Sequence, residues 1–197
     1  MKNKKSNFIN RLVVKDTKKY GKGVFTLTDI KKGTIIYKLD GEKLSLAAVL
    51  SRLISGKESI DDIFQIGKRS YIDLDEFSRT FNHSCNPNTG VRKAGEMFSL
   101  RNIKAGEEIT YDYSLTVAPT VWRMKSRCKC GSVNCRKVVS DILSIPPKRL
   151  EEYKKIANLQ RYIKLLLNDV EKNGSYEMPK YEKLALEKLK KNGVKLI

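Results

Sequence analysis

Apolar and polar residues alternate over short distances in the first 115 positions, and this pattern predicts many short strands. The apolar runs are rich in β-branched and aromatic residues and are separated by Gly and polar clusters, as in strand-rich domains. We expect strands in residues 8–14, 34–39, 64–66, 70–74, 89–91, 97–100 and 109–113. Residues 43–56 differ, because their apolar positions have the spacing of one short amphipathic helix. The pattern therefore indicates a mainly β domain.

The periodicity changes after Ile145, where two prolines close the β-rich part. Residues 148–172 place an apolar residue at every third or fourth position, which predicts one long helix with a Lys/Arg-rich opposite face. Asn173-Gly174 is a typical helix end, and residues 181–191 predict a second helix. This extension either packs on the β domain or on a second copy, or it is a basic arm that holds the protein on nucleic acid.

Charge is unevenly distributed along the 197 residues. The net charge is +18, made of +7 in residues 1–23, zero in 24–119 and +11 in 120–197. Solvated lysine-rich surfaces and attraction to a polyanion both fit this distribution, and charge alone does not separate them. No apolar run approaches the length of a membrane helix, and the start lacks a secretory signal, so we expect an intracellular protein without membrane contact.

A polar segment at residues 79–88 interrupts the strand pattern. It contains the only histidine, His83, and one of four cysteines, Cys85, and Pro87 prevents a helix from continuing through it. Its donors and acceptors need partners if the segment is buried, and polar loops of this kind often carry function. By contrast, Gly21-Lys-Gly23 is weak evidence, since a dinucleotide fingerprint needs a third Gly and a following helix.

The other three cysteines are clustered as C-x-C-x₄-C, at Cys128, Cys130 and Cys135. Together with Cys85 they can form one tetrahedral Cys₄ zinc site that leaves no thiol over. Disulfides or free thiols are the alternative, which the lack of a secretory signal disfavours. A zinc ion there would fasten the cysteine segment to the polar loop, with residues 114–127 as a flexible strap between them.

The motifs at residues 81–88 (Phe-Asn-His-Ser-Cys-Asn-Pro-Asn), 106–113 (Gly-Glu-Glu-Ile-Thr-Tyr-Asp-Tyr) and 21–23, followed by the cysteine segment, resemble the SET-domain protein lysine methyltransferases with a post-SET zinc segment. The resemblance spans residues 8–140. It implies a mainly β SET-domain fold of small curved sheets with a pseudoknot, plus the C-terminal helical extension. The implied divisions are a basic tail (1–7), a SET domain (8–115), a post-SET segment (116–144) and the helices (145–197).

The resemblance also implies an activity, which is methyl transfer from S-adenosylmethionine to a lysine ε-amine of a protein. Tyr113 matches the family's catalytic tyrosine. Tyr111 stands where the family alternates between Phe and Tyr, and a hydroxyl there favours monomethylation. A narrow apolar channel would favour the neutral amine and align the reacting atoms.

Cofactor contacts are implied for a set of residues in the matching motifs. In this family His83 contacts the cofactor and supports the structure, which makes a general-base role a poor interpretation. Lys137 replaces a glycine of the family pattern, which leaves open whether Val138 or Val139 covers the adenine. The expected contacts are Lys22, Gly23, Val24, Tyr71, Arg79, Asn82, His83, Tyr113 and Val138.

For partners, the resemblance implies a protein substrate with an exposed lysine, such as a histone or another basic DNA-associated protein. The basic termini suggest a further contact with nucleic acid or chromatin, and hence a nuclear location in its own or a host cell. The alternative function is a zinc-stapled basic module that binds chromatin or nucleic acid without catalysis. Nothing in the sequence indicates an oligomeric state.

Overall fold

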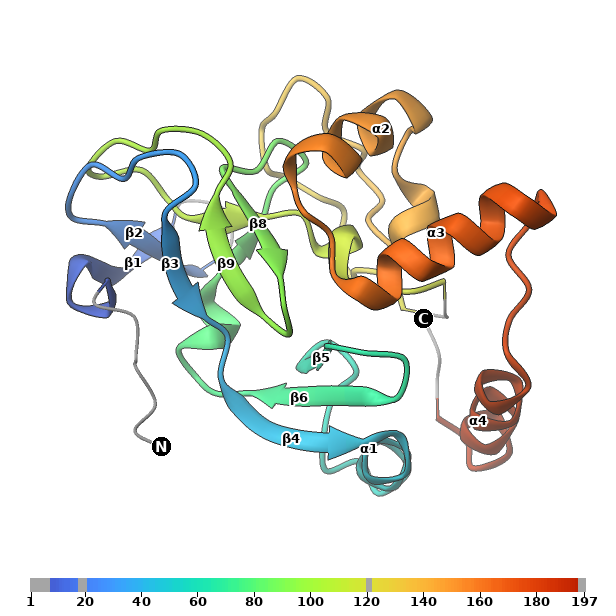
Figure 1. Ribbon diagram of the computed structural model, residues 1–197. Coiled ribbons are helices and arrows are strands. Elements are labelled where there is room, and N and C mark those ends of the chain that lie inside the picture. The colour runs from blue at the N-terminus through green and yellow to red at the C-terminus, as the bar shows by residue number, and fades with distance from the viewer. Residues whose placement is uncertain (1–7, 18–20, 120–121, 195–197) are drawn as a thin grey trace, which may run out of the picture.

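Small β-sheets in the N-terminal two thirds and helices in the C-terminal third make up the protein (Figure 1). The structure is a computed structural model that describes residues 8–17, 21–119 and 122–194. The basic tail predicted for residues 1–7 therefore lies outside the described residues, as do two positions of the predicted strap. The mainly β fold with a helical C-terminal segment, predicted from the sequence, is confirmed.

The described strands form three sheets. A two-stranded sheet pairs β1 (Leu12–Thr17) with β2 (Gly21–Thr26). A three-stranded sheet has the order β4 (Gly41–Ser45), β6 (Ser70–Leu74), β5 (Ile63–Gln65). The five-stranded sheet has the order β3 (Ile35–Lys38), β9 (Glu96–Ser99), β8 (Thr89–Arg92), β10 (Thr110–Tyr111), β7 (Asn82–His83).

The short strand β10 joins the two main sequence motifs. It pairs in parallel with β7, so that Tyr111 lies opposite His83, and in parallel with β8, where Tyr111 lies opposite Thr89. The segments 81–88 and 106–113 are thereby adjacent in one sheet, although they are well separated in sequence. The pseudoknot implied by the resemblance stays a prediction.

The first strand differs from its prediction. Residues 9–11 form a 3₁₀ turn, Ile9–Arg11, and β1 then continues to Thr17, beyond the predicted end at residue 14. Antiparallel pairing with β2 gives the polar residues of this stretch regular backbone partners, from Leu12–Thr26 to Thr17–Gly21. Pairing with a neighbour, which the apolar pattern does not encode, therefore extends the strand.

The predicted helix in residues 43–56 is α1 (Leu46–Ile54). It begins where the Ser45 side chain accepts a hydrogen bond from the Ala48 amide, a standard N-cap. Its buried face carries Val49 and Leu53, which pack with Leu44 of β4. The residues just before the helix are strand β4, which the helical periodicity does not show.

The long helix predicted for residues 148–172 is wrong. Two helices, α2 (Pro147–Ile156) and α3 (Arg161–Asn173), replace it. Asn158 takes the left-handed conformation with φ of 42°, and the buried Gln160 side chain donates to the Gln65 carbonyl oxygen at 3.3 Å. Asn tolerates this conformation better than most residues, and the tertiary contact holds the chain out of helical register. The last helix is α4 (Lys180–Lys191).

Two apolar clusters connect the sheets and the helices. The larger one lies among the sheets and includes the fully buried Val24, Ile36, Met97 and Ile109. The second packs Phe98 and Leu100 of the five-stranded sheet region against α2 and α3 through residues such as Tyr153 and Ile163. The C-terminal helices thus pack on the β domain, as one of the two sequence interpretations holds. Across the described residues, no helix is both long and apolar enough for a membrane span.

Candidate functional site

Two tyrosines lie at the end of β10. Tyr111 is the last residue of that strand, and Tyr113 begins the 3₁₀ turn Tyr113–Thr116. Their ring centroids are 4.8 Å apart. The Tyr113 hydroxyl donates a hydrogen bond of 2.8 Å to the Phe81 carbonyl oxygen. Burial raises the pKa of both phenols, so both stay protonated at neutral pH.

Asn82 fastens the first hairpin to the central sheet. Its side-chain amide donates to the Lys22 carbonyl oxygen at 2.9 Å and to Glu108 Oε1 at 2.7 Å. A Cβ at Gly23 would come within 2.9 Å of Asn82 Nδ2, closer than Cβ atoms normally approach other atoms. Glu108 Oε1 would be nearer still, so a side chain at position 23 would displace the hydrogen-bonded pair of Asn82 and Glu108. Lys22, Gly23 and Asn82 are brought together, and the next residue, Val24, is fully buried.

His83 has a protein partner at each ring nitrogen. Nε2 lies 3.2 Å from Cys85 Sγ, and Nδ1 accepts a hydrogen bond from the Tyr113 amide at 3.2 Å. Burial lowers the pKa of His83 to about 4, against the opposing effect of the Asp112 carboxylate. The ring is thus neutral near pH 7, and its nitrogens hold neighbouring segments in place.

A buried ion pair connects the polar motifs to the cysteine segment. Arg136 Nη2 lies 2.6 Å from Asp112 Oδ1, with only 9% and 1% of the two side chains exposed. The other oxygen of Asp112 accepts a hydrogen bond from the Tyr153 hydroxyl of α2 at 3.3 Å. Asp112 therefore links three parts of the chain: the Tyr-Asp-Tyr motif, the cysteine segment and the C-terminal helices.

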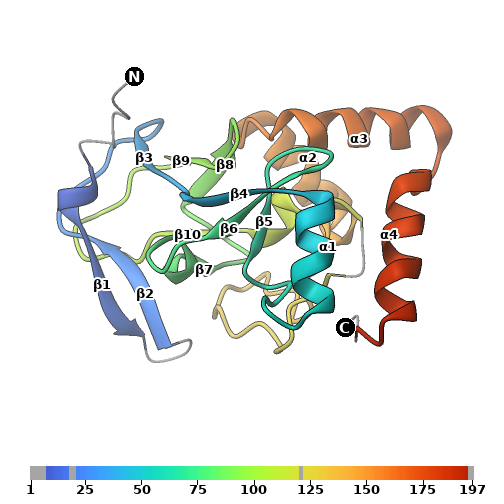
Figure 2. The ribbon, with the colours of Figure 1, turned by 90° about the horizontal axis from the view of Figure 1, so that it is seen from below.

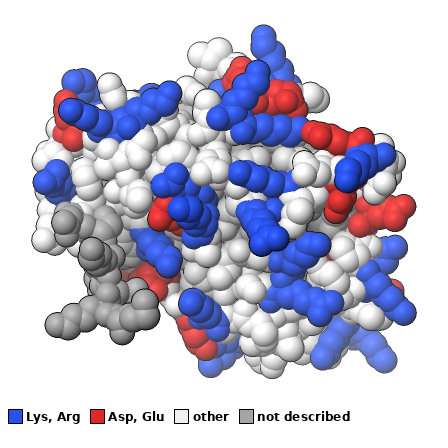
Figure 3. Space-filling model, in the orientation of Figure 1, with Lys and Arg blue, Asp and Glu red and all other residues white. Residues whose placement is uncertain are grey.

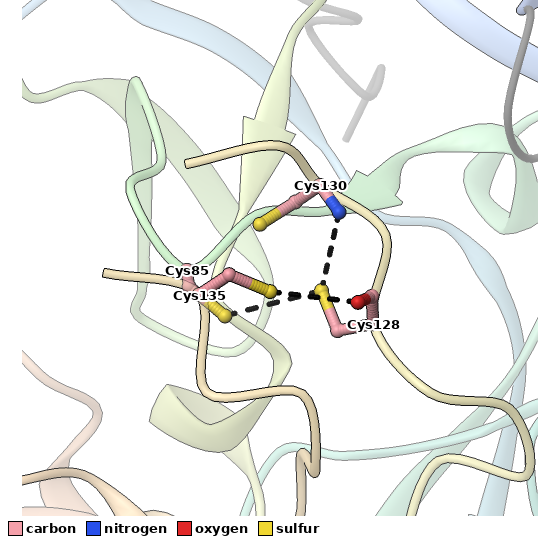
Figure 4. Close-up of side chains that lie close together, drawn as sticks. All are labelled: Cys85, Cys128, Cys130 and Cys135. Carbon is pink, nitrogen blue, oxygen red and sulfur yellow. Dashed lines mark hydrogen bonds between the residues drawn. The ribbon is translucent and has the colours of Figure 1, made fainter. Parts of the chain in front are cut away.

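The four cysteines converge on one point (Figure 4). All four sulfur atoms lie within 4.8 Å of one another, and Cys85 Sγ is 3.9 Å from Cys128 Sγ. Zn–S bonds of about 2.3 Å in a tetrahedron place sulfurs roughly 3.8 Å apart, so the spacing fits such a site. The backbone amide of Arg136 donates to Cys85 Sγ and that of Cys130 to Cys128 Sγ, both at 3.4 Å, which favours thiolates. None of the four forms a disulfide, and the cluster could hold a zinc ion.

Both tyrosines line a cavity of about 190 Å³. Its walls come from α1, β5, the segment after β10 and α4. Aromatic rings are prominent in the lining, namely Phe64, Tyr71, Phe81, Tyr111, Tyr113 and Trp122. The volume is below the roughly 300–1,000 Å³ of pockets for drug-sized ligands, which suits an elongated side chain.

Three residues predicted to contact the cofactor, Tyr71, Arg79 and Val138, are not part of the Lys22–Asn82 junction. Tyr71, on β6, lines the cavity. Arg79 also lines it, but its guanidinium is 2.6 Å from Asp73 Oδ1 and forms longer ion pairs with two further acids. Val138 is 48% exposed, whereas Val139 is fully buried among the cysteines. Of these two valines, Val138 is therefore the one whose side chain a ligand can reach.

Trp122 is a cavity residue that the sequence patterns do not reveal. Its indole nitrogen donates to Asp61 Oδ1 at 3.1 Å, and Asp61 also pairs with Lys125 at 2.7 Å. Its ring centroid is 6.4 Å from that of Tyr113. The predicted flexible strap is therefore anchored at these described positions. The sequence shows only that the single Trp follows the 106–113 motif. Its contact with Asp61, which lies 61 residues earlier, cannot be predicted from local patterns.

Comparison with known proteins identifies the fold. The family model described as "SET domain" matches residues 21–114. Residues 21–114 are a SET domain. The polar segment 79–88 and the tyrosine motif both lie inside it, whereas three of the four cysteines and the C-terminal helices lie outside.

Similar SET-domain proteins are much longer than this chain. The "Variant-silencing SET domain-containing protein" of Plasmodium falciparum is 36% identical over 149 residues, which cover 66% of this chain and 6% of that protein. The "Histone-lysine N-methyltransferase, H3 lysine-36 specific" of Debaryomyces hansenii is 35% identical over 146 residues, covering 68% and 19%. The chain thus spans less than a fifth of the length of either relative.

A solved structure supports the SET assignment. The crystal structure of KRYPTONITE in complex with mCHH DNA, H3(1-15) peptide and SAH matches with a TM-score of 0.51 and 27% identity. The match covers 66% of this chain and 29% of that one.

Proposed function

We propose that this chain is a protein-lysine N-methyltransferase that moves a methyl group from S-adenosylmethionine to a lysine ε-amine. The observation that carries the proposal is the close pair Tyr111 and Tyr113 at one cavity, beside the β7 segment with Asn82 and His83. The names of the relatives, and the SAH and H3 peptide in the KRYPTONITE complex, support it.

The cavity suits the chemistry of an amine nucleophile. When bound, S-adenosylmethionine supplies an electrophilic methyl on a positive sulfonium. The target amine would lose its proton to solvent before it enters the cavity, and as a neutral amine it would accept the methyl group in exchange for the bond between that methyl and the sulfonium. Aromatic walls disfavour the charged ammonium by desolvation. Tyr113, fixed by its bond to the Phe81 carbonyl oxygen, would orient the amine, and the Tyr111 hydroxyl would occupy space that a further methyl needs.

The cofactor would lie near the junction of the first hairpin with β7. Lys22, Gly23 and Asn82 meet there, with Val24 next in the strand, and His83 follows in β7. Val138 is exposed beside the cysteine cluster. Tyr71 and Arg79 lie on the cavity wall, so we propose that they contact the cofactor at the edge of the cavity. Cys85, Cys128, Cys130 and Cys135 would hold one zinc ion that fixes the segment carrying Val138.

The proposed substrate is a histone or another basic DNA-associated protein, and the proposed location is the nucleus of its own or a host cell. The histone-modifying relatives and the DNA in the KRYPTONITE complex support both. Figure 3 shows Lys and Arg gathered at the lower right of the face, where Figure 1 has α4, and the last turn of α4 carries Lys188, Lys190 and Lys191. Such a surface would attract nucleic-acid phosphates.

A second candidate is a zinc-stapled basic module that binds chromatin without catalysis. The cysteine cluster and the basic surface favour it, because neither feature includes Tyr111 or Tyr113 and neither needs methyl transfer.

Incubation with methyl-labelled S-adenosylmethionine and purified histones separates the two candidates. The enzyme transfers label to histone lysines, and mass spectrometry then names the site and the number of methyl groups. The binding module is supported if the protein binds histones or DNA but transfers no label. In that case Tyr113→Phe should bind as the parent chain does.

A further inference from the structure

Helix α4 forms one wall of the tyrosine cavity. Glu182, Ala185, Leu186 and Leu189 of this helix all line it. Their spacing of three, four and seven residues places them on one helix face. Figure 2 shows α4 beside α1, the helix on the other side of the cavity. The wall belongs to the C-terminal extension, outside the residues that match the SET family.

The wall is held near both of its ends. At the N-terminal end, the Tyr181 hydroxyl oxygen lies 3.3 Å from the Lys68 carbonyl oxygen, and the Arg69 guanidinium lies 4.3 Å from the Tyr181 ring centroid. At the C-terminal end, Leu189 is 4% exposed and packs in one cluster with Val49 of α1. The residues between these anchors are therefore presented to the cavity in a defined position.

Glu182 gives this wall a negative charge without a cationic partner. Its carboxylate accepts hydrogen bonds from the Tyr176 hydroxyl at 2.7 Å and from the Tyr181 hydroxyl at 3.1 Å. Among the described residues, no Lys or Arg forms an ion pair with it. The other cavity acids are already paired, Asp61 with Lys125 at 2.7 Å and Asp62 with Arg79 at 3.6 Å.

The charge of Glu182 acts on the cavity lining. Burial raises the pKa of Tyr71, and the negative charge of Glu182 raises it further. A carboxylate without a cationic partner at a binding cavity attracts a cationic side chain that reaches it. Two tyrosine hydroxyls fix its oxygens, so a cationic side chain that reaches it meets a positioned acceptor.

We propose that α4 sets substrate specificity, with Glu182 binding a lysine or arginine side chain that flanks the target lysine, while Leu186 faces apolar parts of the same segment. This deepens the proposed function and rests on it. The substrate class is a protein segment with a second basic residue close to the methylated one.

The test uses the full chain and a basic histone-type peptide in which each Lys or Arg around the target lysine is replaced in turn by Gln. Glu182→Gln keeps the shape and removes the charge; its amide oxygen can still accept from one tyrosine hydroxyl, and its NH2 group can donate to the other hydroxyl oxygen. Glu187→Gln, on an exposed position of α4 outside the cavity lining, is the matched control. Peptide Kd by fluorescence anisotropy and kcat/KM of methyl transfer are both measured, and thermal unfolding checks that each variant is folded.

For the parent chain, replacing one flanking basic residue should weaken binding and raise KM about ten- to hundredfold, the range for a hydrogen bond to a charged group. Glu182→Gln should lose that preference at the same peptide position, with kcat little changed. Glu187→Gln should keep it. Equal flank preference in the parent chain and Glu182→Gln overturns the proposal. If the parent chain transfers no methyl but its Kd depends on Glu182, the proposed function fails and the role of α4 stands.

Discussion

At the scale of single residues, the site depends on hydroxyl and amide groups whose positions are set by backbone partners. Tyr113 is tied to the Phe81 carbonyl oxygen, and its own amide donates to His83 Nδ1. The residue is thus held at both its backbone and its side chain. Polar groups fixed in this way act on a reacting group without reorganisation at the moment of reaction.

Tyr113→Phe should lower kcat of methyl transfer on the order of a hundredfold, because it removes a preorganised hydroxyl whose oxygen would orient the amine. Binding of S-adenosylmethionine, measured by calorimetry, should change little. Tyr37→Phe is the control, since Tyr37 is a buried tyrosine that does not line the tyrosine cavity. Full activity of Tyr113→Phe would contradict the proposed role.

Tyr111→Phe should shift the product from monomethyl-lysine towards di- and trimethyl-lysine. The substitution removes the hydroxyl and leaves the buried ring in contact with Tyr113, so the space for further methyl groups increases. Mass spectrometry of a methylated peptide over time measures the product ratio. An unchanged ratio at full conversion would rule out this function for the hydroxyl.

Some of these residues can be read from the sequence and others cannot. Asn82, His83 and Tyr113 stand in short, specific motifs, so their neighbours in sequence already indicate the site. Arg79 stands in the same motif, yet its guanidinium pairs with Asp73 of β6 and with two acids that precede β5, Glu58 and Asp62. A side chain's direction depends on such distant charges, which local patterns do not contain.

At the scale of elements, the Asp112–Arg136 pair joins the SET domain to the cysteine segment. Arg136→Gln should lower the free energy of unfolding by about 3–5 kcal/mol, because it leaves a buried carboxylate without its cation. Chemical denaturation measures the change.

The control is Lys104→Gln, which breaks the exposed pair between Lys104 and Asp29, whose side chains are 76% and 62% exposed. Exposed pairs contribute about 0–1 kcal/mol, so this variant should be nearly as stable as the parent chain. If both variants lose the same small amount, the buried pair does not act as a structural link.

The helices show where periodicity stops being informative. Apolar residues continue at helical spacing across positions 156–163, so the pattern gives no sign of the break between α2 and α3. The break exists because Gln160 contacts Gln65, far away in the chain. In the same way, the apolar face of α4 predicts that another part of the protein packs against this helix. It does not predict that α4 and α1 line a cavity together.

At the scale of the whole molecule, the cysteine cluster brings the segment with Cys128, Cys130 and Cys135, which follows the SET domain, against Cys85 inside it. The purified chain should contain one zinc per molecule by elemental analysis. Removing zinc with a chelator should lower the unfolding midpoint by on the order of 10 °C, because a loss of about 4 kcal/mol shifts it by about 2–4 °C per kcal/mol. Readdition of zinc should restore both the midpoint and methyl transfer. A metal-free chain with an unchanged midpoint would exclude the zinc site.

The position of β10 has a consequence for biosynthesis. This two-residue strand occupies the gap between β7 and β8, yet it emerges from the ribosome after both of them. Until residue 111 is available, a nascent chain exposes two unpaired strand edges, which are sites for misassociation. We therefore expect translation pauses or truncations before that point to produce aggregates that chaperones must handle, while later interruptions leave a sheet that can already close.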